Sequence, residues 1–287
     1  MQYYKIIFFA LLLLSLSACQ EEGPFINFEE DQVSLVDTSY LSATSISSVN
    51  KNVMFEEFSG VRCSNCPAGN GETNALYVAK GNRFVPVTVH SNFLALPYET
   101  DQDLRNIDAN EIANSLGPVG QKPSAFVNRK IINNIRLQGS LGTWAGLVDA
   151  QLALSSFVNL NLEIVNADET ERTLRYRITM EYNTNAPSHN LGFYLTESEI
   201  ETEQLDGSTH VYDYVHEFVL RKAITPVIGA NVAASVPQNT VIIKEFEIDI
   251  DDYDPTTIWV MNHMHLVAFI RLDNDDIETA TMVDLIP

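Results

Sequence analysis

Hydrophobic positions between residues 51 and 154 follow two different periods in turn. Short β-rich runs at residues 52–58 and 84–91 are typical of strands, and the apolar positions of residues 103–116 repeat along one helical face. The pattern predicts helices over residues 67–80, 103–116 and 143–154, and a hairpin pair at residues 124–129 and 131–137. This order of elements predicts an α/β domain over residues 51–154, with a mixed sheet and flanking helices.

From residue 155 onward, the chain has no helical period of useful length. It carries alternating or β-branched runs at residues 158–165, 172–182, 191–196, 214–220, 241–250, 258–270 and 282–286. Turn-rich segments separate several of these runs. Six or seven such strands predict an all-β sandwich domain over residues 155–287.

The N-terminal segment has the features of a targeting signal. Residues 6–14 are continuously apolar, about half of the ~20 residues that a membrane-spanning helix needs, so they fit the hydrophobic region of a signal peptide. The segment LSAC at residues 16–19 resembles a bacterial lipobox, which implies a lipoprotein signal peptide over residues 1–18 and a lipidated Cys19. An ordinary signal peptide with a chance cysteine, or a short anchor, stays an alternative. Residues 19–50 have a linker's composition and are the expected tether.

The charge of the chain excludes two kinds of partner. There are 38 acidic against 17 basic side chains, and the formal net charge is −21. Nucleic-acid binding requires Lys and Arg to neutralise phosphates, and a polybasic membrane-surface mode requires the same residues near anionic lipid. We therefore expect no nucleic-acid partner, and contact with the membrane through the lipid anchor only.

The strongest chemical signal is the CxxC pair Cys63 and Cys66, which follows a predicted strand and opens a predicted helix. Unpaired N–H groups and the helix dipole at this position favour a thiolate, so Cys63 is the candidate nucleophile and Cys66 the resolving thiol. Arg62 adds a cation that further stabilises a Cys63 thiolate. An inert local disulfide and a zinc site stay open as alternatives, although zinc would need two further ligands.

These residues also carry a family resemblance. The order strand, CxxC, helix, strand, helix, followed by residues 121–129, resembles the thioredoxin fold, which implies that Pro123 is a cis-proline that packs against the disulfide and holds a substrate chain. With the lipobox-like segment ahead and a β-domain behind, the chain resembles the 28-kDa outer membrane protein family of Bacteroidetes lipoproteins, most closely at residues 57–69. It departs from thioredoxin at Arg62, where tryptophan is usual, and at residues 64–65, where Ser-Asn replaces Gly-Pro.

Other polar residues are weaker candidates. His90 closes the second predicted strand, where it could accept a proton from the resolving thiol or be a hydrogen-bonded structural histidine. His263 and His265 share one face of a strand, which suits a metal, but no third ligand is near in sequence. The acidic runs at residues 249–254 and 273–278 resemble calcium ligands in density but lack the glycine of an EF-hand, and solvated turns explain both.

Together these features predict an exported, lipid-anchored protein of the outer membrane, on its periplasmic or its surface face. The acidic pair Glu21 and Glu22 resembles the export signal of surface-displayed lipoproteins. The expected activity is thiol–disulfide exchange with protein substrates through Cys63, Cys66 and Pro123, with no organic cofactor because the cysteine pair carries the electrons. The alternative is a surface binding or adhesion lipoprotein, with a surface ligand as its partner and a structural disulfide.

Overall fold

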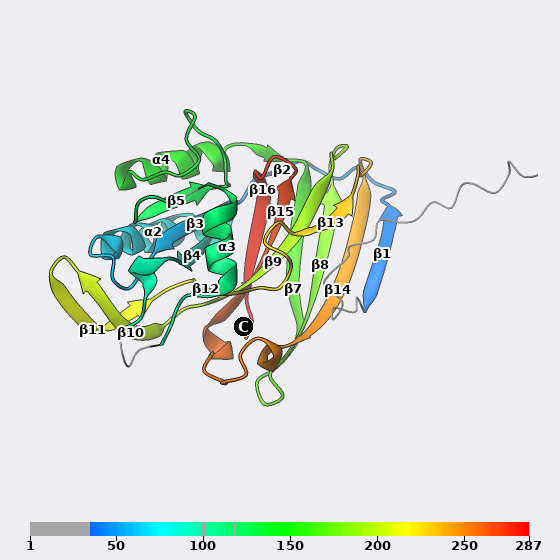
Figure 1. Cartoon of the computed structure of the whole chain (residues 1–287). Coiled ribbons are helices and arrows are strands. Elements are labelled where there is room, and N and C mark those ends of the chain that lie inside the picture. The colour runs from blue at the N-terminus through cyan, green and yellow to red at the C-terminus, as the bar shows by residue number, and fades with distance from the viewer. Residues whose placement is uncertain (1–34, 99–101, 118, 287) are drawn as a thin grey trace, which may run out of the picture.

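One eight-stranded sheet joins the two halves of the chain in the computed structural model, which describes residues 35–98, 102–117 and 119–286 (Figure 1). Its strands are β3 (Val53–Ser59), β4 (Phe84–His90), β5 (Ser124–Val127), β9 (His189–Glu197), β12 (Val219–Ala223), β13 (Ala230–Ala233), β15 (Met264–Leu272) and β16 (Ile277–Asp284). The order is β16-β15-β9-β12-β4-β3-β5, with β13 paired to β9. The parallel contact of β12 with β4 joins the early strands to the late ones.

A second sheet of four strands packs against this one. It consists of β1 (Val36–Leu41), β14 (Thr240–Asp249), β8 (Thr173–Tyr182) and β7 (Val158–Asp168), in that order. Every second residue of β8 is buried, as a strand with one face on a core requires. The buried face packs into a hydrophobic cluster that also contains Leu191, Phe193 and Leu266 of the larger sheet.

Three α-helices in the described residues cover the larger sheet: α2 (Cys66–Lys80), α3 (Ile107–Ser115) and α4 (Leu141–Leu152). The helices α2 and α4 share one cluster with β3, β4 and β5, centred on Phe55 and Trp144. The helix α3 packs into a different cluster through Ala109, Ile112 and Ala113. None of the described helices is long and apolar enough to cross a membrane.

Short elements connect and cap these layers. They are β2 (Val49–Asn50), β6 (Ser155–Ser156), η1 (Gly81–Arg83), η2 (Phe93–Ala95), η3 (Ile250–Asp252) and η4 (Met261–His263). Between β9 and β12 the chain forms a separate hairpin of β10 (Ile200–Asp206) and β11 (Thr209–His216). This hairpin lies at the helical end of the molecule, opposite β1 (Figure 1).

The prediction of an α/β thioredoxin-like domain followed by an all-β sandwich is wrong. The described residues are mostly β, with three α-helices, and strands from after residue 154 share one sheet with β3, β4 and β5. The error arises because the local period of hydrophobic positions identifies a strand but not its partner. The expected boundary at residue 154 falls between α4 and β6, and whether residues 51–154 fold independently stays a prediction.

Two smaller expectations also fail. Residues 131–137 form no named strand and contain a tight turn closed by the isolated bridge between Ile132 and Ile135. The expected tether over residues 19–50 includes β1, which pairs with β14 along its whole length. The serine- and threonine-rich sequence does not indicate β1, because an edge strand with little buried surface needs few apolar residues.

Candidate functional site

A disulfide joins Cys63 and Cys66, with the Cα atoms 5.3 Å apart. Cys63 lies in the loop after β3, and Cys66 is the first residue of α2, with Pro67 next to it in the first helical turn. The side chain of Cys66 is fully buried and that of Cys63 is 4% exposed. The structure therefore places both cysteines at a helix N-terminus, as the spacing predicts, but beneath other parts of the chain.

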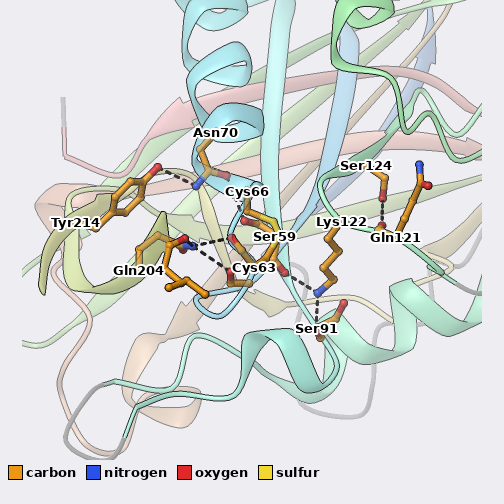
Figure 2. The surroundings of a disulfide bond; sticks show 12 residues. Ser59, Cys63, Cys66, Asn70, Ser91, Gln121, Lys122, Ser124, Gln204 and Tyr214 are labelled. Atoms are coloured by element: carbon orange, nitrogen blue, oxygen red, sulfur yellow. Dashed lines mark hydrogen bonds between the residues drawn. A yellow bond between two sulfur atoms is a disulfide. The ribbon is translucent and has the colours of Figure 1, made fainter. Parts of the chain in front are cut away.

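The β10–β11 hairpin covers this disulfide. The Leu205 N–H donates to the carbonyl of Val61 (2.8 Å), and the Gly207 N–H donates to that of Ser64 (2.9 Å). The buried amide of Gln204 donates through Nε2 to the carbonyl of Cys63 (3.1 Å; Figure 2). Since these bonds occur on both sides of Cys63, the hairpin is held directly against the CxxC loop.

The peptide bond between Lys122 and Pro123 is cis. The ammonium of Lys122 donates to the carbonyl of Ser59 (2.6 Å) and to that of Ser91, which ties this loop to the ends of β3 and β4 (Figure 2). Burial lowers the pKa of Lys122 to about 8. A Cβ atom at Gly69 would lie 2.6 Å from the Pro123 Cβ, so only glycine permits this close approach of α2. Pro123 thus lies beside α2, and its role in holding a substrate chain stays a prediction.

The guanidinium of Arg62 points to the segment after η2. It donates to the carbonyls of Leu96 (2.8 Å) and Pro97 (2.6 Å) and lies 4.7 Å from the ring centroid of Tyr98. These contacts hold the segment against the CxxC loop. Stabilisation of a Cys63 thiolate by Arg62 stays a prediction.

A buried acid that the sequence analysis missed lies next to this site. Glu57 in β3 is fully buried, and this burial raises its pKa to about 8, although a hydrogen bond from Thr73 (2.5 Å) acts in the opposite direction. The amide nitrogen of Asn70 faces Glu57 Oε1 (2.8 Å) and the carbonyl of Cys66 (3.3 Å) when its oxygen accepts from the Tyr214 hydroxyl (3.1 Å). One signal in the sequence is the pair of adjacent glutamates, Glu56 and Glu57, within the short strand just before the CxxC.

His90 lies near a second histidine that the sequence analysis left unassigned. The rings of His90 and His216 are 5.3 Å apart between centroids, and both side chains are buried. Neither ring nitrogen of His90 has a hydrogen-bond partner among the described residues. Burial, His216 and two nearby cations lower the pKa of His90 well below its usual value, and burial lowers that of His216 to about 4. Proton transfer by His90 stays a prediction.

The other two candidate histidines each contact a carboxylate. His263 faces Glu199 (3.2 Å), and His265 faces Asp284 (2.8 Å), so the two histidines have separate partners.

The acidic runs have basic partners. Arg172 pairs with Asp251 (2.5 Å) and Asp254 (2.8 Å), and Lys130 pairs with Asp276 (2.6 Å). Within the described residues, no group of three or more His, Cys, Asp or Glu side chains could hold a metal ion. A calorimetric titration with calcium is the direct test of calcium binding at these acidic runs.

Comparisons with known proteins bear on the family and the fold. The family model described as outer membrane protein Omp28 matches residues 112–284, more than half of the chain. HBP35 of Porphyromonas gingivalis is similar over 84% of this chain and 77% of its own, with 15% identity and a TM-score of 0.64. Protein AGR_C_4864 from Agrobacterium tumefaciens is similar over 83% and 96%, with 12% identity and a TM-score of 0.50. At these identities the likenesses concern the fold alone.

A domain of the outer membrane lipoprotein Omp28 from Porphyromonas gingivalis covers 45% of this chain and 88% of its own, with 15% identity and a TM-score of 0.30. No curated protein matches the chain. The family match confirms the expected outer-membrane location, while the expected lipidation site Cys19 lies outside the described residues. The chain belongs to the outer membrane protein Omp28 family.

Proposed function

We propose that this outer membrane lipoprotein is a surface binding protein in which the Cys63–Cys66 disulfide is structural. One observation carries the proposal: the β10–β11 hairpin covers the disulfide, leaving Cys66 buried and Cys63 4% exposed. Thiol–disulfide exchange begins when a thiolate attacks a disulfide sulfur, so it requires access to that sulfur. A covered disulfide instead constrains the loop before α2 and reduces the conformational entropy of the unfolded chain.

The contacts around the disulfide support its assignment as a structural disulfide. The hairpin is bonded to the loop on both sides of Cys63, through the backbone of Leu205 and Gly207. The Arg62 guanidinium is engaged with the carbonyls of Leu96 and Pro97. Access for a protein substrate would therefore require the hairpin to move away and these backbone hydrogen bonds to break.

Insulin reduction tests the proposal. The full-length protein, the Cys63→Ser variant and a matched Ser64→Ala variant are each compared with dithiothreitol alone. We expect all three rates to equal that of dithiothreitol, because the disulfide does not exchange with a protein substrate. A faster rate with the wild-type and Ser64→Ala proteins that is lost in Cys63→Ser would overturn the structural assignment.

A second candidate, thiol–disulfide exchange, is favoured by the buried acid. In that reaction, starting from the reduced pair, the Cys63 thiolate attacks a substrate disulfide, forms a mixed disulfide and releases one substrate thiolate. Near pH 8, where part of the Glu57 population is ionised, the Cys66 thiol then loses its proton to the Glu57 carboxylate and attacks the Cys63 sulfur, which closes the protein disulfide and releases the second thiolate. The pKa of about 8 suits Glu57 to such a transfer, and Asn70 connects it to the Cys66 backbone. This route predicts that Glu57→Gln slows insulin reduction while Glu247→Gln, an exposed acid, does not.

A further inference from the structure

A cavity of about 380 Å³ lies between the early and late parts of the chain, away from the disulfide. One wall comes from α2, η1 and β4, and the other from β7 and β16. The lining residues are Tyr77, Asn82, Phe84, Ile164, Met282, Val283 and Asp284. This volume falls in the range of small-molecule sites, which often form where two parts of a fold meet.

The cavity contains polar groups that are available to a ligand. Within the part of the chain that the structure describes, neither the Tyr77 hydroxyl nor the Asn82 side-chain amide has a hydrogen-bond partner. The Asp284 carboxylate is engaged through Oδ1 by His265 (2.8 Å), which leaves its second oxygen to accept. Burial and the charge of Asp284 raise the pKa of Tyr77, so its hydroxyl remains a donor.

The edge of β16 adds backbone groups to this set. Among the described residues, β15 is the one strand that pairs with β16. The Leu285 N–H donates to Met264 of the β15 side, while the Ala280 carbonyl accepts from Asn52 outside the sheet. Backbone groups alternate along an antiparallel strand, so those of Met282, which lines the cavity, share the outward direction of Ala280.

The chemistry of the lining selects a class of ligand. No Lys or Arg lines the cavity, and Asp284 and the net charge of −21 disfavour anions. Donors from Tyr77, Asn82 and the strand edge stand beside acceptors from the same groups and from Asp284. Hydroxyl groups both donate and accept, so a polyhydroxylated molecule can satisfy both kinds.

Apolar side chains supply the remaining contact surface. Ile164, Met282 and Val283 line the cavity together with the aromatic ring of Tyr77. The C–H faces of a sugar ring are apolar, while its edge carries hydroxyls. We propose that this cavity is a binding site for a neutral saccharide of one or two rings. The inference rests on the proposed surface-binding function and names its ligand class.

Titration of the full-length protein in a saccharide-free detergent tests this site. The probes are maltose, cellobiose and N,N′-diacetylchitobiose, followed by calorimetry and saturation-transfer NMR. We expect at least one of them to bind in the millimolar range. Asn82→Ala should weaken binding about three- to tenfold because it removes one net hydrogen bond. Asp284→Asn should weaken binding by a similar factor, because it replaces a charged acceptor with a neutral amide whose hydrogen bonds are weaker. Val78→Ala, an exposed change on α2, should leave binding unchanged.

Two outcomes would overturn the saccharide site. One is that none of the three disaccharides binds, including the case in which an extended neutral peptide binds along β16. The other is that a disaccharide binds with the same affinity to wild type, Asn82→Ala and Asp284→Asn. Insulin reduction and saccharide titration are separate assays. Insulin reduction that depends on Cys63 would overturn the proposed function, while absent saccharide binding would overturn only the saccharide site.

Discussion

Replacement of the buried acid Glu57 by glutamine tests how this region is stabilised. Glu57 is fully buried, and its pKa is raised from 4.5 to about 8 because burial disfavours the charged form. At neutral pH the folded protein therefore keeps this carboxyl protonated, while the unfolded chain ionises it. Glutamine has the same shape, is neutral at every pH and can still accept the hydrogen bond from Thr73.

The sign and size of the effect follow from these two pKa values. The folded state binds more protons than the unfolded state between pH 4.5 and 8, so stability falls as pH rises through this window. Because the unfolded chain ionises Glu57 more readily than the folded protein does, this group lowers the free energy of unfolding by about 3 kcal/mol at pH 7. The decrease approaches about 5 kcal/mol above pH 8. An amide N–H without a full partner costs Glu57→Gln about 1 kcal/mol. We therefore expect the variant to be more stable than wild type by about 2 kcal/mol at pH 7.

Urea unfolding at pH 5, 7 and 9 measures this difference. The free energy of unfolding of Glu57→Gln minus that of wild type should increase with pH and level off above pH 8. Comparison at each pH cancels the titration of other groups, such as His90 and Lys122. Glu247→Gln, at an exposed position, should show no such increase. Parallel pH profiles for Glu57→Gln and wild type would refute a buried, protonated Glu57.

Three further predictions concern the disulfide, an ion pair and the hairpin. Removing the disulfide by Cys63→Ala with Cys66→Ala should retain the circular dichroism spectrum and lower the free energy of urea unfolding by about 2 kcal/mol, as expected for a short closed loop; no loss would contradict a structural role. Arg129→Met should lower it by about 3–5 kcal/mol because it leaves the buried Glu56 carboxylate without its partner, and a loss below about 1 kcal/mol would contradict that pairing. The pKa of His216 is lowered to about 4, so its stabilising contribution is present above pH 6.5 and is lost as pH falls towards 4. Proteolysis of the hairpin should be faster at pH 5 than at pH 7, and His216→Phe should reduce the difference to the part that His90 contributes, because the pKa of His90 is also lowered; an unchanged difference would contradict the role of His216.

Local sequence features predict the elements around the disulfide well. The CxxC opens α2 within one residue of the expected helix start, and Pro123 lies at a cis bond beside that helix. The helix start is a local feature, because a proline in the first turn acts on the adjacent backbone. The cis bond before Pro123 is implied by the resemblance to the thioredoxin fold and not by the local sequence. Strand β8 likewise shows in its burial the alternation that its sequence indicates.

Long-range pairing and covering segments are not visible in the same patterns. The sequence does not reveal that β12 pairs with β4, or that the hairpin of β10 and β11 covers Cys63, since both depend on contacts between distant segments. The hairpin over Cys63 matters for function, because it favours a structural disulfide over one that exchanges with protein substrates. The burial of Glu57 was also missed, although two adjacent acids, Glu56 and Glu57, within a short strand are a usable signal.

The reduction potential of the Cys63–Cys66 disulfide tests the central claim most directly. The full-length protein is equilibrated with thioredoxin or with glutathione buffers of defined ratio, and the free thiols are trapped and counted. Because the hairpin covers the disulfide and the folded structure holds it closed, we predict a value below about −300 mV, typical of structural disulfides in secreted proteins. A value between about −270 and −120 mV, the range of exchange catalysts, would contradict the account.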